Sequence, residues 1–123
     1  MKLKKVIVTG GRGYMDKMRV FVELNAERPS IVVHGACKKK GSEGLSGADR
    51  WADEWGNEQE GVDVQRYPAN WTKYGLGAGP VRNQVVVDEH PDADTCLAFP
   101  GGRGTADMVR RCRKAGIPVR EIR

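Results

Sequence analysis

The stretch Phe99-Pro100-Gly101-Gly102-Arg103-Gly104-Thr105-Ala106-Asp107 decides how the rest of the chain is interpreted. A short apolar run over 95–99 leads into it, and apolar residues at helical spacing follow it. The order of strand, glycine loop and helix brings backbone N–H groups to a helix N-terminus, where an anion is favoured. The same order also fits a plain tight turn between a strand and a helix. This stretch alone therefore leaves a phosphate cradle and a simple turn both open.

Strand-like and helix-like segments alternate along the whole chain. Strands are predicted over 4–8, 30–34, 63–67, 95–99 and 118–122, and helices over 16–27, from 48 to near 61, over 80–89 and over 105–115. This alternation predicts an α/β fold, a doubly wound parallel sheet of about five strands with helices on both faces. We expect one domain over 1–123. If the first strand is central, the loops after the first and fourth strands face each other at the usual ligand crevice.

Composition limits the classes of function. The chain has 123 residues, which suits one hydrophobic core, and its formal charge is +5. Its three cysteines, Cys37, Cys96 and Cys112, have no metal-ligand spacing, so we expect neither a metal nor a cofactor. No apolar run reaches the roughly 20 residues of a membrane span, and the basic start has no signal-peptide core. We therefore expect a cytoplasmic protein without a membrane partner.

Basic residues gather in two places, at Lys38-Lys39-Lys40 and along 110–123. A solvated surface is the first interpretation, an anionic small ligand the second and a polynucleotide the third. The loops 35–46 and 68–79 are unusually long and both follow strands, a position that is more often functional than idle. Trp71 and Tyr74 in the second loop either stack on a base or pack the loop against the domain.

The candidate binding residues lie in two glycine loops and at helix starts. The first glycine loop is Gly10-Gly11-Arg12-Gly13, after the first strand, and the second is Gly101-Gly102-Arg103-Gly104, after the fourth. Arg12 and Arg103 each accompany backbone donors, a combination that suits phosphate or carboxylate. Arg82-Asn83 begins the third predicted helix, and Asp49 near the start of the second either balances the helix dipole or accepts from a ribose hydroxyl. The first loop lacks the third glycine of the dinucleotide fingerprint, because Met15 stands there, and conventional NAD binding is disfavoured. Asp107 and Asp49 are the best carboxylate candidates for catalysis.

Several stretches together resemble a known family. They are Val8-Thr9-Gly10-Gly11-Arg12, His34-Gly35, Gly47-Ala48-Asp49-Arg50, Tyr67-Pro68-Ala69-Asn70-Trp71, Ala78-Gly79-Pro80-Val81-Arg82-Asn83 and the stretch from Ala98 to Asp107. In this order the chain is similar to the SLOG superfamily, specifically to small YspA-related (cpYpsA-type) proteins, and more distantly to the Lonely Guy phosphoribohydrolases. The resemblance implies a Rossmann-like fold and a pocket for a nucleotide or a nucleotide-derived ligand.

Two departures from the family pattern affect the functional prediction. The link between His34-Gly35 and the second helix is lengthened by 38–46, which adds positive charge near the expected pocket. The catalytic glutamate of the Lonely Guy hydrolases would fall on Met108, while Asp107 lies one residue early, about 100° around a helix. We therefore predict sensing or sequestering of a ligand, in phage–host or bacterial conflict. The alternative is cleavage of the N-glycosidic bond of a nucleoside monophosphate, with Asp107 or Asp49 as the carboxylate.

The predicted ligand-binding set follows from the loops and from the resemblance. It comprises Gly10, Gly11, Arg12, Gly35, Asp49, Arg50, Trp71, Tyr74, Arg82, Asn83, Pro100, Gly101, Gly102, Arg103, Gly104 and Thr105. A nucleotide-derived small molecule is the expected partner. A homodimer or higher homo-oligomer is also predicted, because the valines at 85, 86 and 87 surround more of their helix than one buried face needs.

Overall fold

A computed structural model describes residues 3–123, in which strands and helices alternate from one end to the other. Their order is β1 (Lys5–Thr9), α1 (Lys17–Glu27), β2 (Ile31–His34), α2 (Gly47–Glu58), β3 (Asp63–Arg66), α3 (Trp71–Tyr74), the 3-10 turn η1 (Gly75–Gly77), α4 (Ala78–Glu89), β4 (Thr95–Ala98), α5 (Arg103–Lys114) and β5 (Val119–Glu121). The strands form one five-stranded sheet in the order β3-β2-β1-β4-β5. Every pairing is parallel, so the predicted Rossmann-like fold is confirmed, and β1 is central, as the facing of the two loops required.

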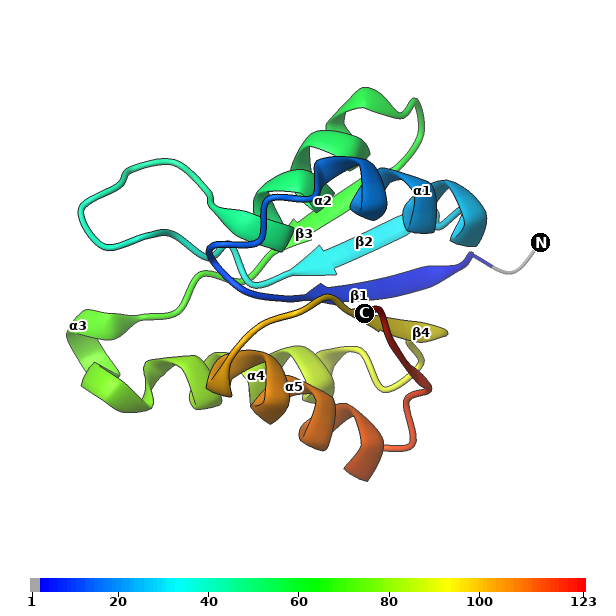
Figure 1. Ribbon diagram of the computed structural model, residues 1–123. Coiled ribbons are helices and arrows are strands. Elements are labelled where there is room, and N and C mark those ends of the chain that lie inside the picture. Colours follow the sequence, from blue (N-terminus) through cyan, green and yellow to red (C-terminus); the bar gives the residue numbers. More distant parts are fainter. Residues whose placement is uncertain (1–2) are drawn as a thin grey trace.

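Helices cover both faces of the sheet (Figure 1), with α1 and α2 on one face and α4 and α5 on the other. The alternation of side chains along β1 explains both layers, since successive residues of a strand point to opposite faces. Val6 and Val8 join the core beneath α1 and α2, together with Leu24 and Trp55. Ile7 joins the opposite core, which α4 and α5 cover. The central strand is therefore buried on both sides, as a parallel sheet requires.

The chain leaves β1 toward β2 on one side and later returns to β4 on the other. This change of direction creates a crevice beyond the carboxyl ends of β1 and β4, where ligands bind in doubly wound sheets. The loop over 35–46 and the segment of α3 and η1 project beyond the sheet on that same side (Figure 1). The topology thus places both long segments around the crevice.

One prediction about the chain was incomplete. The segment 68–79 was expected to be a loop, but it contains α3 and η1, and α4 already begins at Ala78. Asn70 starts α3, because its side chain accepts a hydrogen bond of 3.0 Å from the N–H of Lys73. Pro80 lies in the first turn of α4, where its missing N–H does no harm. The last long helix also begins earlier than expected, at Arg103 rather than Thr105.

Gly10 provides a test of how closely the layers approach. A Cβ at Gly10 would lie 2.6 Å from the Cβ of Ala48 and 3.0 Å from the Cβ of Phe99. Both neighbours are buried, so we expect Gly10→Ala to lower the free energy of unfolding by about 1–3 kcal/mol through overpacking. Urea unfolding measures the change. Gly13→Ala is the control, because nothing lies within 4 Å of its added Cβ, and equal stability of the two variants would refute the expectation.

Candidate ligand-binding site

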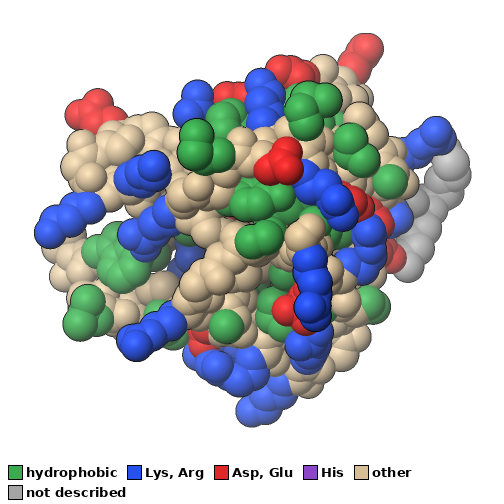
Figure 2. All heavy atoms as spheres, in the orientation of Figure 1, with side chains coloured by type: hydrophobic (Ala, Val, Ile, Leu, Met, Phe, Trp, Pro, Cys, Tyr) green, Lys and Arg blue, Asp and Glu red, His purple; other side chains and the backbone are tan. Residues whose placement is uncertain are grey.

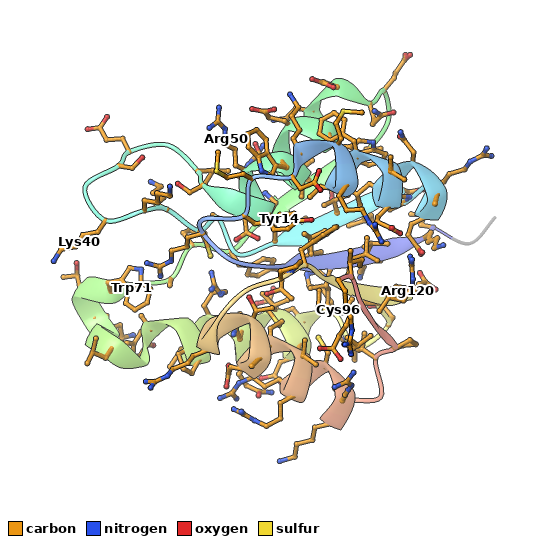
Figure 3. The ribbon with its side chains drawn as sticks, in the orientation of Figure 1. Tyr14, Lys40, Arg50, Trp71, Cys96 and Arg120 are labelled. Atoms are coloured by element: carbon orange, nitrogen blue, oxygen red, sulfur yellow. The ribbon has the colours of Figure 1, made fainter. Side chains whose placement is uncertain are left out.

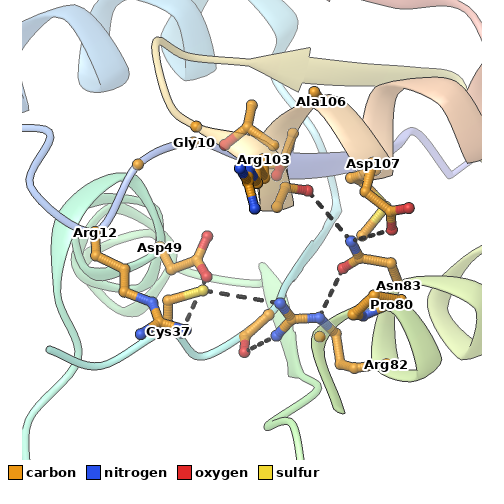
Figure 4. Close-up of a pocket in the computed structure, with 18 of the residues that line it drawn as sticks. Gly10, Arg12, Cys37, Asp49, Pro80, Arg82, Asn83, Arg103, Ala106 and Asp107 are labelled. Carbon is orange, nitrogen blue, oxygen red and sulfur yellow. Dashed lines mark hydrogen bonds between the residues drawn. The ribbon is translucent and has the colours of Figure 1, made fainter. Parts of the chain in front are cut away.

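A cavity of about 800 Å³ opens at the carboxyl ends of β1 and β4 (Figure 4). Most of the predicted binding residues line it, namely Gly10, Gly11, Arg12, Gly35, Asp49, Trp71, Arg82, Asn83, Gly102, Arg103, Gly104 and Thr105. They come from six separate parts of the sequence, which the topology brings to one edge of the sheet. The volume lies within the ~300–1,000 Å³ that is usual for small-molecule sites.

Four of the predicted residues lie outside this cavity. Arg50 stacks over the ring of Trp51 at 4.6 Å, and Tyr74 lines a small separate hollow on α4. Pro100 and Gly101 line another cavity, near the C-terminal residues Ile122 and Arg123. Gly101 has a packing role, because its added Cβ would lie only 2.2 Å from the Oγ1 of Thr105.

Other lining residues were not predicted, among them Cys37, Leu76, Pro80, Ala106 and Arg110. Leu76 is 98% exposed, although leucine normally avoids water. A single large apolar residue among the glycines of 75–79 was the signal that could have identified it. Cys37 lies near the start of the long loop after β2, and the length of that loop had predicted a functional role for it.

The N-terminus of α5 opens directly into the cavity. No side chain caps it, and its first turn contains no acidic residue. The first N–H groups of any α-helix lack partners within the helix, and they carry the positive end of its dipole. A Cβ at Gly102 or at Gly104 would meet nothing within 4 Å, so no packing contact explains either glycine. An anion can therefore approach this backbone closely.

The first glycine loop has a different role from the one predicted for it. The N–H of Gly11 donates a hydrogen bond of 2.9 Å to the carbonyl of Pro100, so this donor joins the two loops and does not face a ligand. The carbonyl of Gly11 accepts from the N–H groups of Tyr14 and Ala48 at 3.2 and 3.3 Å. The prediction that backbone donors of 10–13 hold a phosphate therefore fails at Gly11. The loop forms a wall of the cavity and positions the loop before α5.

Four arginines line the cavity: Arg12, Arg82 and Arg103, which Figure 4 labels, and Arg110, which pairs with Asp107. Arg103 is exposed and has neither an ion pair nor a hydrogen bond of its side chain among residues 3–123. Arg12 lies over the ring of Trp71 at 5.4 Å, which keeps both side chains at the mouth. Arg82 is different, because its guanidinium donates hydrogen bonds to other groups of the protein.

Arg82 ties the ends of β2 and β3 to α4. Its Nη1 donates to the carbonyl of Gly35 and, at 3.2 Å, to that of Tyr67. Its Nε donates at 2.8 Å to the side chain of Asn83, the next residue of α4. Gly35 permits this approach, since a Cβ there would lie 2.3 Å from Nη1. Arg82 keeps its positive charge beside the cavity, but most of its donors are already used.

The two candidate carboxylates have different surroundings. Asp107 is buried and accepts hydrogen bonds from Asn83 at 3.0 Å, from Arg111 at 2.8 Å and from Arg110. Burial raises the pKa of Asp107, but the hydrogen bonds from Arg111 and Asn83 and the charges of both arginines outweigh it, so the pKa lies below its ordinary value. Asp49 accepts from the N–H of Cys37 at 3.0 Å and has no ion pair within the described chain. Asp49 is at least as buried as Asp107, but its carboxylate is not neutralised by an arginine among residues 3–123.

Cys37 lines the cavity but is not activated as a nucleophile. Burial raises its pKa to about 11, helped by the charge and hydrogen bond of Asp49, while Arg82 opposes the shift. At pH 8 we expect iodoacetamide to alkylate Cys37 about 100-fold more slowly than a free cysteine, because the thiolate is the reactive form. Peptide mass spectrometry over time measures the rate, with the urea-unfolded protein as the reference. Modification as fast as in the unfolded chain would contradict this expectation.

The fold and the site together define a class of protein. A doubly wound parallel sheet with an open helix N-terminus at its switch point is typical of Rossmann-like domains that bind anionic ligands. Within residues 3–123 there is no group of His, Cys, Asp and Glu side chains placed to hold a metal ion. No helix in this part of the chain is long and apolar enough to cross a membrane.

Comparison with known proteins agrees with this class. The model of the YspA, cpYpsA-related SLOG family matches residues 4–74. The Gene 61 protein of Mycobacterium phage D29 is 40% identical over 126 aligned residues, which cover 95% of this chain and 94% of the phage protein. No solved structure matches the chain. The chain belongs to the YspA, cpYpsA-related SLOG family, as its sequence motifs predicted.

Proposed function

We propose that the protein binds a nucleotide or a nucleotide-derived small ligand in the cavity at the carboxyl ends of β1 and β4. The observation that carries this proposal is the uncapped N-terminus of α5 beside the unpaired Arg103. Backbone N–H groups and a free guanidinium together favour a phosphate over a neutral ligand. Membership of the SLOG family supports the same ligand class.

The other cavity residues suit the rest of such a ligand. The Asp49 carboxylate lines the cavity beside Cys37, and we propose that it accepts a hydrogen bond from a ribose hydroxyl. Trp71 and Leu76 offer an apolar surface for a base, and Arg12 supports the ring of Trp71. We propose that binding serves to sense or sequester the ligand in the cytoplasm during phage–host or bacterial conflict. The similarity to a mycobacteriophage protein supports that setting.

Isothermal titration tests the proposal. The ligands are the four nucleoside 5′-monophosphates, ADP-ribose and cyclic nucleotides, and the proteins are the wild type and Arg103→Ala. Arg82→Ala is avoided because Arg82 holds strand ends together. Arg113→Ala is the matched control, since Arg113 is also on α5 but pairs with Glu121 away from the cavity. Binding that is weakened only in Arg103→Ala supports the proposal, and equal binding by all three proteins would count against it.

A phosphoribohydrolase-like enzyme is the second candidate, because Asp107 and Asp49 both line the cavity. The lowered pKa of Asp107 and its two arginine partners make it a poor proton donor or nucleophile. Met108, which occupies the position of the hydrolase glutamate, is buried and supplies no acid. Release of free base from AMP by the wild type, abolished in Asp107→Asn, would favour the enzyme over the binding protein.

We also propose that the protein forms a homodimer through α4. Val81 and Val85 on α4 are 37% and 38% exposed, whereas Val86 and Val87 are buried in the core of their own chain. The exposed pair, with Tyr74 beside it, lines a shallow apolar hollow that a second copy would cover. Light scattering of the wild type and of Val81→Lys would give the mass in solution, and a monomer in both cases would refute the dimer.

A further inference from the structure

The ligand cavity continues into a second cavity of about 570 Å³ under the long loop after β2. The two cavities share Arg12, Gly35, Cys37, Trp71, Leu76 and Arg82 as lining residues. The far wall of the second cavity consists of Ala36, Pro68, Ala69 and the three lysines of 38–40. The basic loop therefore borders an extension of the binding site. Basic side chains also gather on the projecting loops in the space-filling view (Figure 2).

The charges of Lys38, Lys39 and Lys40 are not compensated by any ion pair within residues 3–123. The other basic cluster behaves differently, since four of its arginines pair with carboxylates of the protein. Arg110 and Arg111 pair with Asp107, and Arg113 and Arg120 pair with Glu121, Glu23 and Glu27. The second cavity thus adds uncompensated positive charge to that of Arg103 in the first cavity.

The loop that carries the lysines is anchored at its base. The N–H of Ser46 donates at 2.8 Å to the carbonyl of Cys37, and the Oγ of Ser46 accepts at 3.2 Å from the N–H of Lys39. The N–H of Cys37 in turn donates a hydrogen bond of 3.0 Å to the carboxylate of Asp49, which lines the first cavity. Figure 3 shows Lys40 on this loop and Trp71 on α3 at the same end of the molecule. The same hydrogen bonds therefore fix the position of the loop relative to the first cavity.

We propose that Lys38, Lys39 and Lys40 form a second anion subsite, and that the ligand is a nucleotide with another phosphate beyond its ribose. This inference rests on the proposed function, because it takes the first phosphate to lie at the N-terminus of α5. The lining residues divide accordingly, because Arg103 and Asp49 line the first cavity alone, Trp71 lines both cavities, and the lysines line the second alone. A nucleoside between two phosphates matches this alternation of basic, polar, aromatic and basic walls.

Isothermal titration at about 0.1 M salt tests the subsite. The probes, with each of the four bases, are nucleoside 5′-monophosphates, nucleoside 3′,5′-bisphosphates and 5′-phosphorylated dinucleotides. The last two distinguish a terminal second phosphate from a phosphodiester. The test variant is Lys38→Gln/Lys39→Gln/Lys40→Gln. The control is Arg113→Gln/Lys114→Gln/Arg123→Gln, which removes the same charge from residues that line neither of these two cavities. Thermal unfolding checks that all proteins are folded.

We expect the wild type and the control to bind a bisphosphate or a dinucleotide about tenfold more tightly than the monophosphate. The lysine variant should lose this gain and keep its affinity for the monophosphate. Equal affinity for one and two phosphates, or a gain that survives in the lysine variant, would overturn the subsite while leaving the proposed function intact. If no probe binds, both proposals fall. If a single-stranded 20-nucleotide DNA binds more tightly than every small probe through the lysines, the loop is a nucleic-acid contact and the subsite is wrong.

Discussion

Arg103→Glu is expected to weaken the binding of a nucleoside monophosphate by about 100-fold or more and to leave the protein folded. The substitution removes a charge-assisted contact and places a carboxylate beside the phosphate. A hydrogen bond to a charged group contributes about 1.5–3 kcal/mol, and each 1.4 kcal/mol is a factor of ten in Kd. Repulsion between the two negative charges adds to this loss.

The same substitution, Arg103→Glu, is expected to raise the stability of the folded protein. Arg103 is exposed, and its side chain has no partner among residues 3–123, so its removal breaks no contact. A carboxylate in the first turn of α5 also complements the helix dipole, by about 0.3–1 kcal/mol. Titration calorimetry and thermal unfolding on the same samples separate the two effects. The control is Arg113→Glu at the other end of α5, which should bind like the wild type. Unchanged affinity in Arg103→Glu would remove the main support for a phosphate at this helix.

Asp107→Ala is expected to lower the free energy of unfolding by about 2–4 kcal/mol at pH 7. Asp107 is 9% exposed and holds Asn83 of α4 together with Arg110 and Arg111 of α5. Its removal costs the buried amide of Asn83 its shorter hydrogen bond and leaves that amide the carbonyl of Gly104 at 3.3 Å. It also removes the carboxylate partner of the half-buried Arg111, which keeps the side chain of Gln84 as an acceptor. The loss of charged partners away from water is costly. Urea unfolding measures the change. Asp92→Ala is the control, because the Asp92 side chain is 71% exposed and its ion pair with Lys5 contributes little.

The same carboxylate predicts how stability depends on pH. The pKa of Asp107 in the folded protein lies below the ordinary value of 3.8. Its stabilising contribution is therefore fully present above that value and disappears as the pH falls through the folded pKa. The difference in stability between the wild type and Asp107→Ala should shrink at pH 3 relative to pH 7. A difference that grows on acidification would contradict the ion-pair network.

The sequence predicted the sheet well, because burial on both faces gives a signal that depends on local residues only. The apolar runs at Val6–Val8 and at 95–99 were typical of buried strands, and the alternation with helices predicted a parallel sheet. The central position of the first strand was assumed as a condition, and the structure shows it. Helix boundaries were less accurate. Without contacts across the chain, the cap that Asn70 provides for α3 could not be distinguished from an ordinary polar loop residue.

The candidate site was predictable in position but not in the roles of its residues. The glycine loops were correctly placed at one edge, yet the bond from Gly11 to Pro100 joins residues far apart in sequence. Arg82 was expected to bind a ligand, while its partners Gly35 and Tyr67 directly follow β2 and β3, far from it in sequence. The lowered pKa of Asp107 likewise depends on a hydrogen bond from Asn83, which lies on another helix. Such roles arise from tertiary contacts, which spacing along one chain does not reveal.

The central claim is that a phosphate binds at the N-terminus of α5, and nuclear magnetic resonance tests it most directly. Titration of the ¹⁵N-labelled protein with the tightest-binding nucleoside monophosphate should shift the amide resonances of 102–105 most strongly. Smaller shifts are expected near Asp49 and Trp71, and none at the C-terminal end of α5. Shifts confined to other surfaces, or largest shifts at amides of 110–114 with 102–105 unmoved, would contradict the account.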